Sequence, residues 1–225
     1  DLQKGNINAL VTAPIHKAAI QSEDFRFPGH TDYLAQAFDG DALMFLVHPD
    51  LRVALVTDHV AVKDIARHIT TDRVAQKLNS VAHSLQQDFG ISNPRIAVLG
   101  LNPHAGDEGV IGEEEVNLLE PLLQTYQIDK REISGPFSAD AFFGSQSYKN
   151  YDAILAMYHD QGLIPFKTLS FGQGVNFTAG LSAVRTSPDH GTAFNIAGTG
   201  QANPHSFRQA VQTAIEVVKS RKVSI

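Results

Sequence analysis

The sequence predicts an α/β fold built on a mixed sheet. Short apolar runs rich in Val, Ile and Leu alternate with longer amphipathic segments, which is typical of strands alternating with helices. A His-Pro-Asp turn at 48–50 joins two of these runs directly and predicts an antiparallel hairpin within the sheet. With 225 residues, 43% of them hydrophobic, the chain can bury a core as one large domain or two small ones. No repeat or Pro/Gly-rich linker marks a boundary between domains.

The expected elements follow from the apolar pattern in chain order. Strands are predicted at 7–12, 43–47, 53–57, 96–101 and 153–158. The clearest helix covers 72–89, because Val74, Leu78 and Leu85 recur at helical spacing. Thr70 or Thr71 can cap this helix and Gly90 can end it. Two further helices are predicted at 116–126, which contains Pro121, and at 207–219.

Composition excludes several classes of function. The formal charge of −6 leaves no basic stripe for a phosphate backbone, so we expect no nucleic-acid partner. The chain has no cysteine, so a metal would have to be held by His, Asp or Glu. No apolar run is long enough to cross a bilayer, and the first residues lack the apolar core of a secretory signal. We therefore expect a cytoplasmic protein without a membrane partner.

Three of the ten histidines share one sequence context. His59, His104 and His159 each follow closely on an apolar strand candidate, and ligands of α/β sheets bind at the carboxyl ends of strands. Three imidazoles with one open position describe a catalytic metal site. Any one of them alone would more simply be a loop histidine bonded to a backbone carbonyl, but the shared context favours the metal. The other histidines outside the motifs below are expected to be solvated surface groups: His48, His68, His83 and His205.

A cluster after His159 suggests a phosphate site. Lys167 and Arg185 can form charge-assisted hydrogen bonds to phosphate, and the glycines of 172–176, which ends at Asn176, allow close backbone approach. A solvated loop with two surface cations would explain the same residues.

Two further segments precede expected helices. The turn at 27–32 presents His30 and Thr31, which can bind an anion or simply cap the helix. The loop at 189–193 with the later Gly198 and Gly200 could hold a nucleotide, although it lacks the GxGxxG spacing.

Taken together, these segments resemble the 4-hydroxythreonine-4-phosphate dehydrogenase family of pyridoxal phosphate biosynthesis. The matching segments run in order along nearly the whole chain: ALVTAPIHK, FPGHTDYLA, LVTDH, LGLNPHAGDEG, ISGPFSAD, MYHDQGLIPFK, GVNFTAGL and VRTSPDHGTAFNIAGTG. The resemblance implies a two-domain mixed-sheet architecture like that of the isocitrate and isopropylmalate dehydrogenases. It also implies a homodimer whose subunits share each site. Because family members begin well before this chain does, the first domain is expected to be incomplete.

The resemblance also assigns roles to individual residues. It implies that a divalent ion, zinc, magnesium or cobalt, is held by His59, His104 and His159, with His159 reaching the partner's site. The residues implied to bind the phosphorylated substrate are His30, Thr31, Lys167, Asn176 and Arg185. The residues implied to bind NAD or NADP are His190, Gly191 and Thr192. Asp160 is expected either to orient His159 or to be solvated.

The implied reaction is the metal-dependent oxidation of 4-phosphohydroxy-L-threonine at its secondary alcohol. The β-keto acid formed would lose carbon dioxide to give 3-amino-2-oxopropyl phosphate. Three alternatives stay open at this stage: a dehydrogenase of 4-phospho-threonate or erythronate, a hydrolase in which the metal activates water, and an inactive metal- and phosphate-binding fragment.

Overall fold

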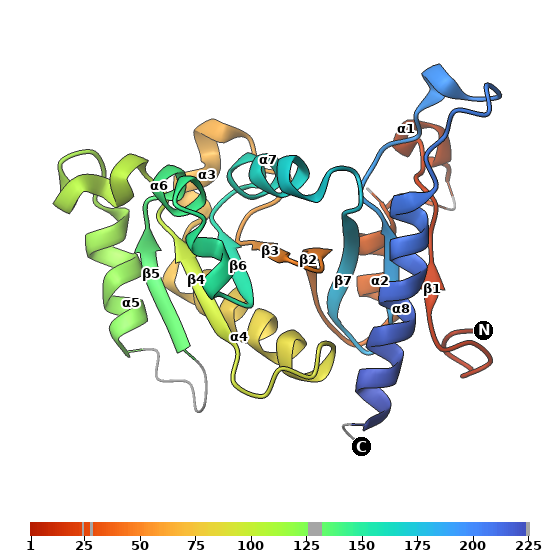
Figure 1. Ribbon diagram of the computed structural model, residues 1–225, viewed down its shortest axis with the longest axis horizontal. Coiled ribbons are helices and arrows are strands. Elements are labelled where there is room, and N and C mark those ends of the chain that lie inside the picture. Colours follow the sequence, from red (N-terminus) through yellow and green to blue (C-terminus); the bar gives the residue numbers. More distant parts are fainter. Residues whose placement is uncertain (24, 28, 126–131, 224–225) are drawn as a thin grey trace.

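The computed structural model describes residues 1–23, 25–27, 29–125 and 132–223, and its centre is one eight-stranded mixed sheet (Figure 1). The strands are β1 (Leu10–Val11), β2 (Gly40–His48), β3 (Leu51–Leu55), β4 (Arg95–Leu99), β5 (Glu132–Phe137), β6 (Ala153–Ala156), β7 (Val175–Leu181) and β8 (Arg185–Pro188). Their order is β1-β8-β7-β2-β3-β6-β4-β5, so β1 and β5 form opposite edges. The expected α/β class with a mixed sheet is confirmed.

The strand directions explain where a site can form. β3, β6, β4 and β5 are neighbours and run parallel, so their carboxyl ends lie at one edge of the sheet. β2 is antiparallel to both β3 and β7. The predicted hairpin is confirmed, because His48 of β2 pairs with Leu51 of β3.

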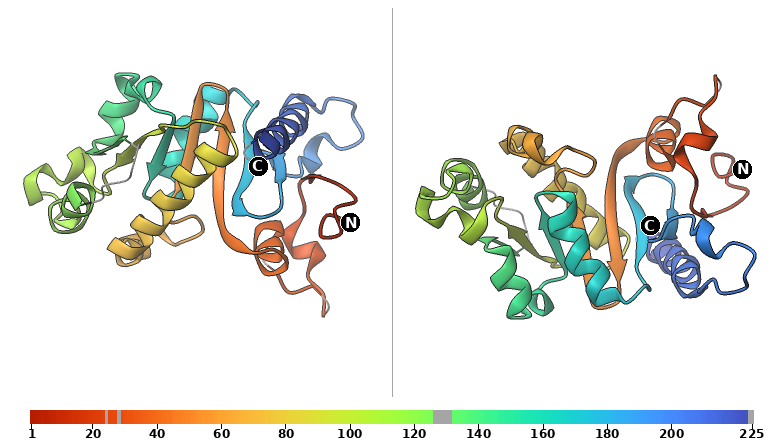
Figure 2. Two further views of the ribbon diagram at one scale, coloured as in Figure 1. Left: turned by 90° about the horizontal axis from the view of Figure 1, so that it is seen from below. Right: turned by 90° about the horizontal axis from the view of Figure 1, so that it is seen from above.

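Helices cover both faces of the sheet. They are α1 (Lys17–Ile20), α2 (His30–Ala37), α3 (Ile65–His68), α4 (Thr71–Gln87), α5 (Glu120–Thr125), α6 (Ala139–Gly144), α7 (His159–Ser170) and α8 (His205–Val223). α4, α5 and α8 bury side chains against one face, and α6 and α7 pack on the other. The two views of Figure 2 accordingly show α4 and α7 on opposite sides of the strands. None of the described helices is long and apolar enough to cross a membrane.

The best-predicted helix forms for the expected reasons. The Thr70 hydroxyl caps α4 by accepting a hydrogen bond from the Arg73 backbone N–H at 3.3 Å. Val74, Leu78 and Leu85 are fully buried against the sheet, as their spacing predicted.

Several elements were not predicted. β5, β7 and β8 carry Gly, Asn or Pro, which have weak strand preference, and α7 contains Gly162 and Pro165. The second predicted helix begins as a π-helical turn, Glu115–Leu119, before α5, and its expected end at Tyr126 lies outside the described residues.

The four histidines expected on the surface divide into two pairs. His83 and His205 are exposed, as predicted. For His48 the prediction was wrong: its side chain is only 15% exposed, because it lies at the end of β2 with its Nδ1 accepting a hydrogen bond from the Asp50 N–H. His68, at the end of α3, is half-buried.

Gly162 lets α7 lie close to the sheet. A Cβ at this position would lie 2.8 Å from Leu55 Cδ2, 2.9 Å from Val53 Cγ1 and 3.1 Å from Ala156 Cβ. We expect Gly162→Val to lower the free energy of unfolding by about 1–3 kcal/mol, because overpacking forces side chains or backbone to shift. Urea unfolding would measure the loss, with Gly144→Val as the control, since nothing lies within 4 Å of a Cβ at Gly144. Equal stability of the two variants would contradict the close packing of α7.

Candidate active site

A cavity of about 480 Å³ lies between the sheet, the start of α2 and the loops that follow β3 and β8. It brings together eight of the residues singled out from the sequence: His30, Thr31, His59, Lys167, Asn176, Arg185, His190 and Gly191. Segments far apart in the sequence therefore share one cavity.

Alternation along two strands builds the floor of this cavity. Asn176 of β7 pairs with Ser187 of β8, and Thr178 pairs with Arg185, so the four side chains share one face of the sheet. Phe177 lies between Asn176 and Thr178 in the sequence and points into the core on the opposite face. The strand periodicity that builds the core thus also directs polar groups into the cavity.

Arg185 is a buried cation without a carboxylate partner. The residue is only 5% exposed, and its Nε and Nη2 donate hydrogen bonds to Thr12 Oγ1 at 3.0 and 2.7 Å. Its Nη1 donates to Thr178 Oγ1 at 3.2 Å. Among the described residues no carboxylate forms an ion pair with it.

The charge of Arg185 is retained despite this burial. Loss of hydration lowers the pKa of Arg185 to about 10, so the guanidinium is still positive at neutral pH. A buried charge without a partner is unfavourable. Asp32, Asp58 and Asp189 also line the cavity, but none of them forms an ion pair with Arg185 in the described structure, so the part of the cavity beside this guanidinium suits an anionic ligand.

His30 and Thr31 lie beside this guanidinium at the start of α2. The Arg185 Nη2 and His30 Nδ1 atoms are 3.4 Å apart. Burial first, and the charge of Arg185 second, lower the pKa of His30. The imidazole is therefore neutral at physiological pH, and can give or receive a hydrogen bond without adding charge.

Asn176 presents an unsatisfied acceptor. Its side-chain oxygen is buried and has no hydrogen-bond partner among the described residues. Buried polar groups in proteins are nearly always hydrogen-bonded, so an exception that lines a cavity points to a ligand group with a hydrogen to donate.

Lys167 adds a second positive charge at the rim of the cavity. Its side chain is 54% exposed, and its Nζ lies 3.7 Å from Asp189 Oδ1. Burial raises the pKa of Asp189, while the charge of Lys167 opposes that rise. Lys167 comes from α7 and Asp189 from the end of β8, so this pair joins two elements around the cavity.

The structure brings two of the three candidate metal ligands together. His59 follows β3 and His159 begins α7 directly after β6, and the two ring centroids are 5.9 Å apart. The His159 Nδ1 lies 2.7 Å from Asp160 Oδ1, which leaves its Nε2 available to a ligand. His104 follows β4, the next strand along, and is exposed. Within the described ranges of this single chain, no three His, Asp or Glu side chains gather closely enough to hold a metal ion.

The family profile of the pyridoxal phosphate biosynthetic protein PdxA matches residues 1–214 of this chain. The chain belongs to the PdxA family. The 4-hydroxythreonine-4-phosphate dehydrogenase of Bacteroides thetaiotaomicron is 51% identical over 224 residues, which cover 99% of this chain and 62% of that protein. The chain thus spans a little under two thirds of the length of this relative.

Solved structures agree with this assignment. The crystal structure of 4-hydroxythreonine-4-phosphate dehydrogenase from Klebsiella pneumoniae superposes with a TM-score of 0.81 at 35% identity, over 97% of this chain and 66% of that one. Isocitrate dehydrogenase from Methylococcus capsulatus superposes with a TM-score of 0.55 at 12% identity, over 95% of this chain and 69% of that one. The second likeness concerns the fold alone, and it confirms the expected similarity to the fold of the isocitrate dehydrogenases.

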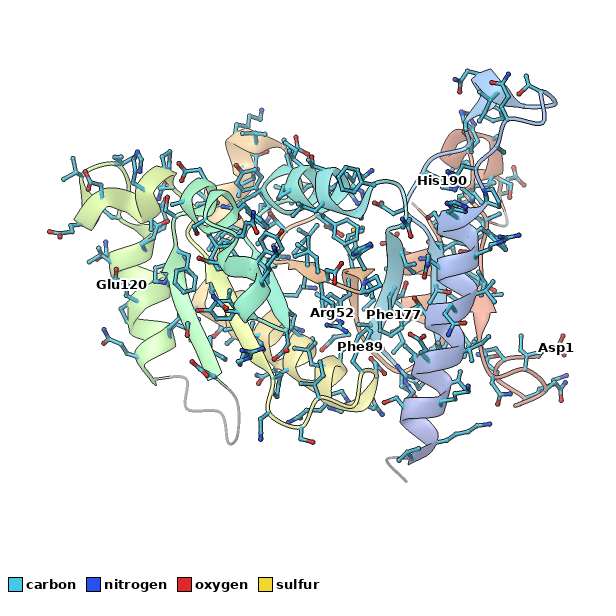
Figure 3. All side chains as sticks on the ribbon, in the orientation of Figure 1. Asp1, Arg52, Phe89, Glu120, Phe177 and His190 are labelled. Carbon is cyan, nitrogen blue, oxygen red and sulfur yellow. The ribbon has the colours of Figure 1, made fainter. Side chains whose placement is uncertain are left out.

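The candidate nucleotide loop of this PdxA-family chain lies at the open end of the cavity. Figure 3 shows His190 beside the first turn of α8, and its Nδ1 lies 2.9 Å from the Gly191 carbonyl oxygen. His190 and Gly191 line the cavity and are exposed, whereas Thr192 is not among the lining residues.

Sequence reasoning missed Ser187, which lines the cavity, and also Thr12 and Thr178, which hold Arg185. Arg185 with Ser187, and Asn176 with Thr178, nevertheless show the two-residue spacing of side chains on one face of a strand. The alternative in which Lys167 and Arg185 are two solvated loop cations is wrong for Arg185, which is buried in β8.

Asp189 gives a testable pH dependence. Because its pKa is raised in the folded protein, the folded state binds more protons than the unfolded state above pH 3.8, so this group lowers stability as the pH rises through that window. Asp189→Asn removes the effect. We expect the stability of the variant relative to the parent to increase from pH 3.8 upward and then level off.

Chemical unfolding of both proteins across this pH range measures the difference, with Asp50→Asn on the exposed hairpin turn as the control. A difference between Asp189→Asn and the parent that does not change with pH would contradict the burial of this carboxyl.

Proposed function

We propose that this PdxA-family chain acts in the metal-dependent, NAD(P)-linked oxidation of 4-phosphohydroxy-L-threonine. The observation that carries the proposal is Arg185, a buried guanidinium that faces a cavity without a carboxylate partner in the described structure. The names of the Bacteroides and Klebsiella relatives, both 4-hydroxythreonine-4-phosphate dehydrogenases, agree with a phosphorylated substrate.

In this proposal the substrate's phosphate lies against Arg185, and Lys167 screens its remaining charge from the rim. Guanidinium and ammonium groups form short, charge-assisted hydrogen bonds with phosphate oxygens. The neutral His30 and the Thr31 hydroxyl donate to the same ligand from the start of α2. Binding energy from this remote group would hold the carbon being oxidised in a reactive position.

Asn176 would bind the end of the substrate that lies away from the phosphate and carries its amino or hydroxyl group. Its buried oxygen can accept a hydrogen bond from an ammonium group, as in phosphohydroxythreonine, or from a hydroxyl group, as in 4-phospho-threonate or erythronate. We favour the amino acid because the named relatives act on it, and the other substrates are outcomes of the test below.

For the metal we propose His59, His104 and His159 as ligands, with a homodimer completing the site. The single chain pairs His59 with His159, which supports a site that needs a further ligand from a second copy. Imidazole nitrogen favours zinc or cobalt over magnesium, which prefers oxygen. A divalent ion bound there would lower the pKa of the substrate's secondary hydroxyl.

The hydride acceptor is proposed to lie on the loop of His190, Gly191 and Thr192, next to the cavity. NAD and NADP are equally compatible with this loop. Loss of the hydroxyl proton to solvent and of a hydride from the same carbon to the nicotinamide would leave a β-keto acid, which decarboxylates readily. A reaction that draws on the nicotinamide pool leads us to propose a cytoplasmic location.

The test is the appearance of reduced nicotinamide absorbance with 4-phosphohydroxy-L-threonine, after chelation and again after addition of zinc or cobalt. Parallel reactions would contain 4-phospho-D-erythronate or 4-phospho-L-threonate. Metal-dependent reduction with the amino acid alone supports the proposal. Reduction with the threonate or erythronate alone would replace the substrate, and absence of reduction with all of them, in a protein that binds metal, would refute the activity for this chain.

A further inference from the structure

The segment that carries His104 has an unusual backbone. Five consecutive residues of Pro103–Gly109, from His104 to Glu108, have φ between 47° and 82°, and four of them are not glycine. L-residues visit this left-handed region as single positions and do not normally form runs in it. Such backbone persists only where the surrounding structure holds it, and it is concentrated at functional sites.

A buried carboxylate binds the residue that immediately precedes this left-handed turn. Glu115 is 0% exposed, its Oε1 accepts the Asn102 backbone N–H at 2.7 Å, and its Oε2 accepts from Asn102 Nδ2 at 2.9 Å. Asn102 is the residue immediately before the turn. Glu114 binds the same amide through its Oε2 at 2.7 Å. No basic side chain of the described residues forms an ion pair with Glu115.

Two glycines give this carboxylate the space it occupies. A Cβ at Gly100 would lie 3.0 Å from Glu115 Oε1, and a Cβ at Gly106 would lie 2.7 Å from Glu115 Oε2. Gly106 is itself the central residue of the left-handed run, with a φ of 82°. The carboxylate therefore fits against both the start and the middle of the turn.

Burying a carboxylate without a cation is unfavourable, and an apolar residue would fill the same space at a lower free energy of burial. Both side-chain hydrogen bonds of Glu115 within the described residues go to Asn102. The benefit of this arrangement must therefore lie in the geometry of the turn, whose exposed residues are Pro103, His104, Asp107 and Glu108; of these, His104 alone carries an imidazole.

We propose that Glu115 is a positioning residue for His104: by clamping Asn102 it fixes the left-handed turn that presents the imidazole to the metal. This inference rests on the proposed function, in which His104 is a ligand. It assigns to a buried acidic side chain the preorganisation of His104, the proposed ligand that lies outside the His59–His159 pair.

The test is the binding of Co²⁺ to the 225-residue chain, followed by its visible absorption, which reports the number and type of ligands. Glu115→Gln keeps the size of the side chain but replaces one carboxylate oxygen by an NH2 group, which cannot accept a hydrogen bond from Asn102. We expect Co²⁺ affinity to fall about 10- to 100-fold, as is typical when a group that orients a ligand is lost. The absorption spectrum should shift toward that of His104→Ala.

Two controls separate positioning from general loss of stability. Leu119→Ala, fully buried on the same π-helical turn, should destabilise the fold yet leave the affinity and spectrum of bound Co²⁺ unchanged. If circular dichroism shows that Glu115→Gln does not fold, Asn102→Ala decides, because it removes the other half of the clamp and should give the same spectral shift.

Different results would contradict the metal site and the positioning role of Glu115. Wild-type Co²⁺ affinity in His104→Ala would refute the proposed metal site and the role of Glu115 with it. Weakened binding in His104→Ala together with unchanged affinity and spectrum in folded Glu115→Gln would overturn the positioning role alone.

Discussion

Replacing Arg185 by Gln should weaken the binding of the phosphorylated substrate about 100-fold, equivalent to about 3 kcal/mol. The guanidinium is the buried positive charge of the cavity, and Gln can offer only neutral hydrogen bonds in its place. Arg185→Lys should restore little of the affinity, because an ammonium group cannot keep the contacts to both Thr12 and Thr178 while also meeting the ligand.

Titration calorimetry with the substrate measures this loss, and thermal unfolding verifies that each variant folds. Arg67→Gln is the matched control, because Arg67 is exposed on α3, where it forms an ion pair with Asp64. Undiminished affinity in folded Arg185→Gln would mean that the phosphate, if bound, lies elsewhere.

His159→Ala should lower the rate of metal-dependent turnover roughly 10³-fold, which corresponds to the loss of about 4 kcal/mol of transition-state stabilisation. The ring stands 5.9 Å from that of His59, and its Nδ1 is already occupied by Asp160, so its remaining nitrogen is placed to bind an ion. The fold should be largely unaffected, because His159 is partly exposed at the first position of α7.

Metal content by elemental analysis, together with the rate of nicotinamide reduction, tests this prediction. His83→Ala, on the exposed face of α4, controls for the loss of an imidazole as such. A His159→Ala protein that retains wild-type metal content and rate would remove His159 from the proposed ligand set.

The apolar pattern predicted the centre of the fold and the position of the histidines. β2, β3, β4 and β6 are Val-, Leu- and Ile-rich strands buried on both faces, and such runs are visible without a structure. That each of the three histidines follows a strand was visible in the sequence, whereas only the structure shows that these strands, β3, β6 and β4, are adjacent and parallel and so place the histidines at one edge of the sheet.

The floor of the cavity could not be predicted in the same way. β8 is the polar segment Arg-Thr-Ser-Pro, yet all four residues are buried, because hydrogen bonds satisfy them: Thr186 donates to the Ala210 carbonyl oxygen of α8 at 2.8 Å. Such partners lie far away in the sequence and leave no periodic signal. For the same reason the clamp between Asn102 and Glu115, thirteen positions apart, has no local pattern.

The most direct test of the central claim, that the cavity beside Arg185 binds a phosphorylated substrate, is calorimetric titration of this chain with 4-phosphohydroxy-L-threonine and, separately, with 4-hydroxy-L-threonine. We expect the phosphorylated compound to bind at least about 100-fold more tightly, since only it carries a phosphate group to pair with the buried guanidinium. Equal affinity for the two compounds would contradict the claim.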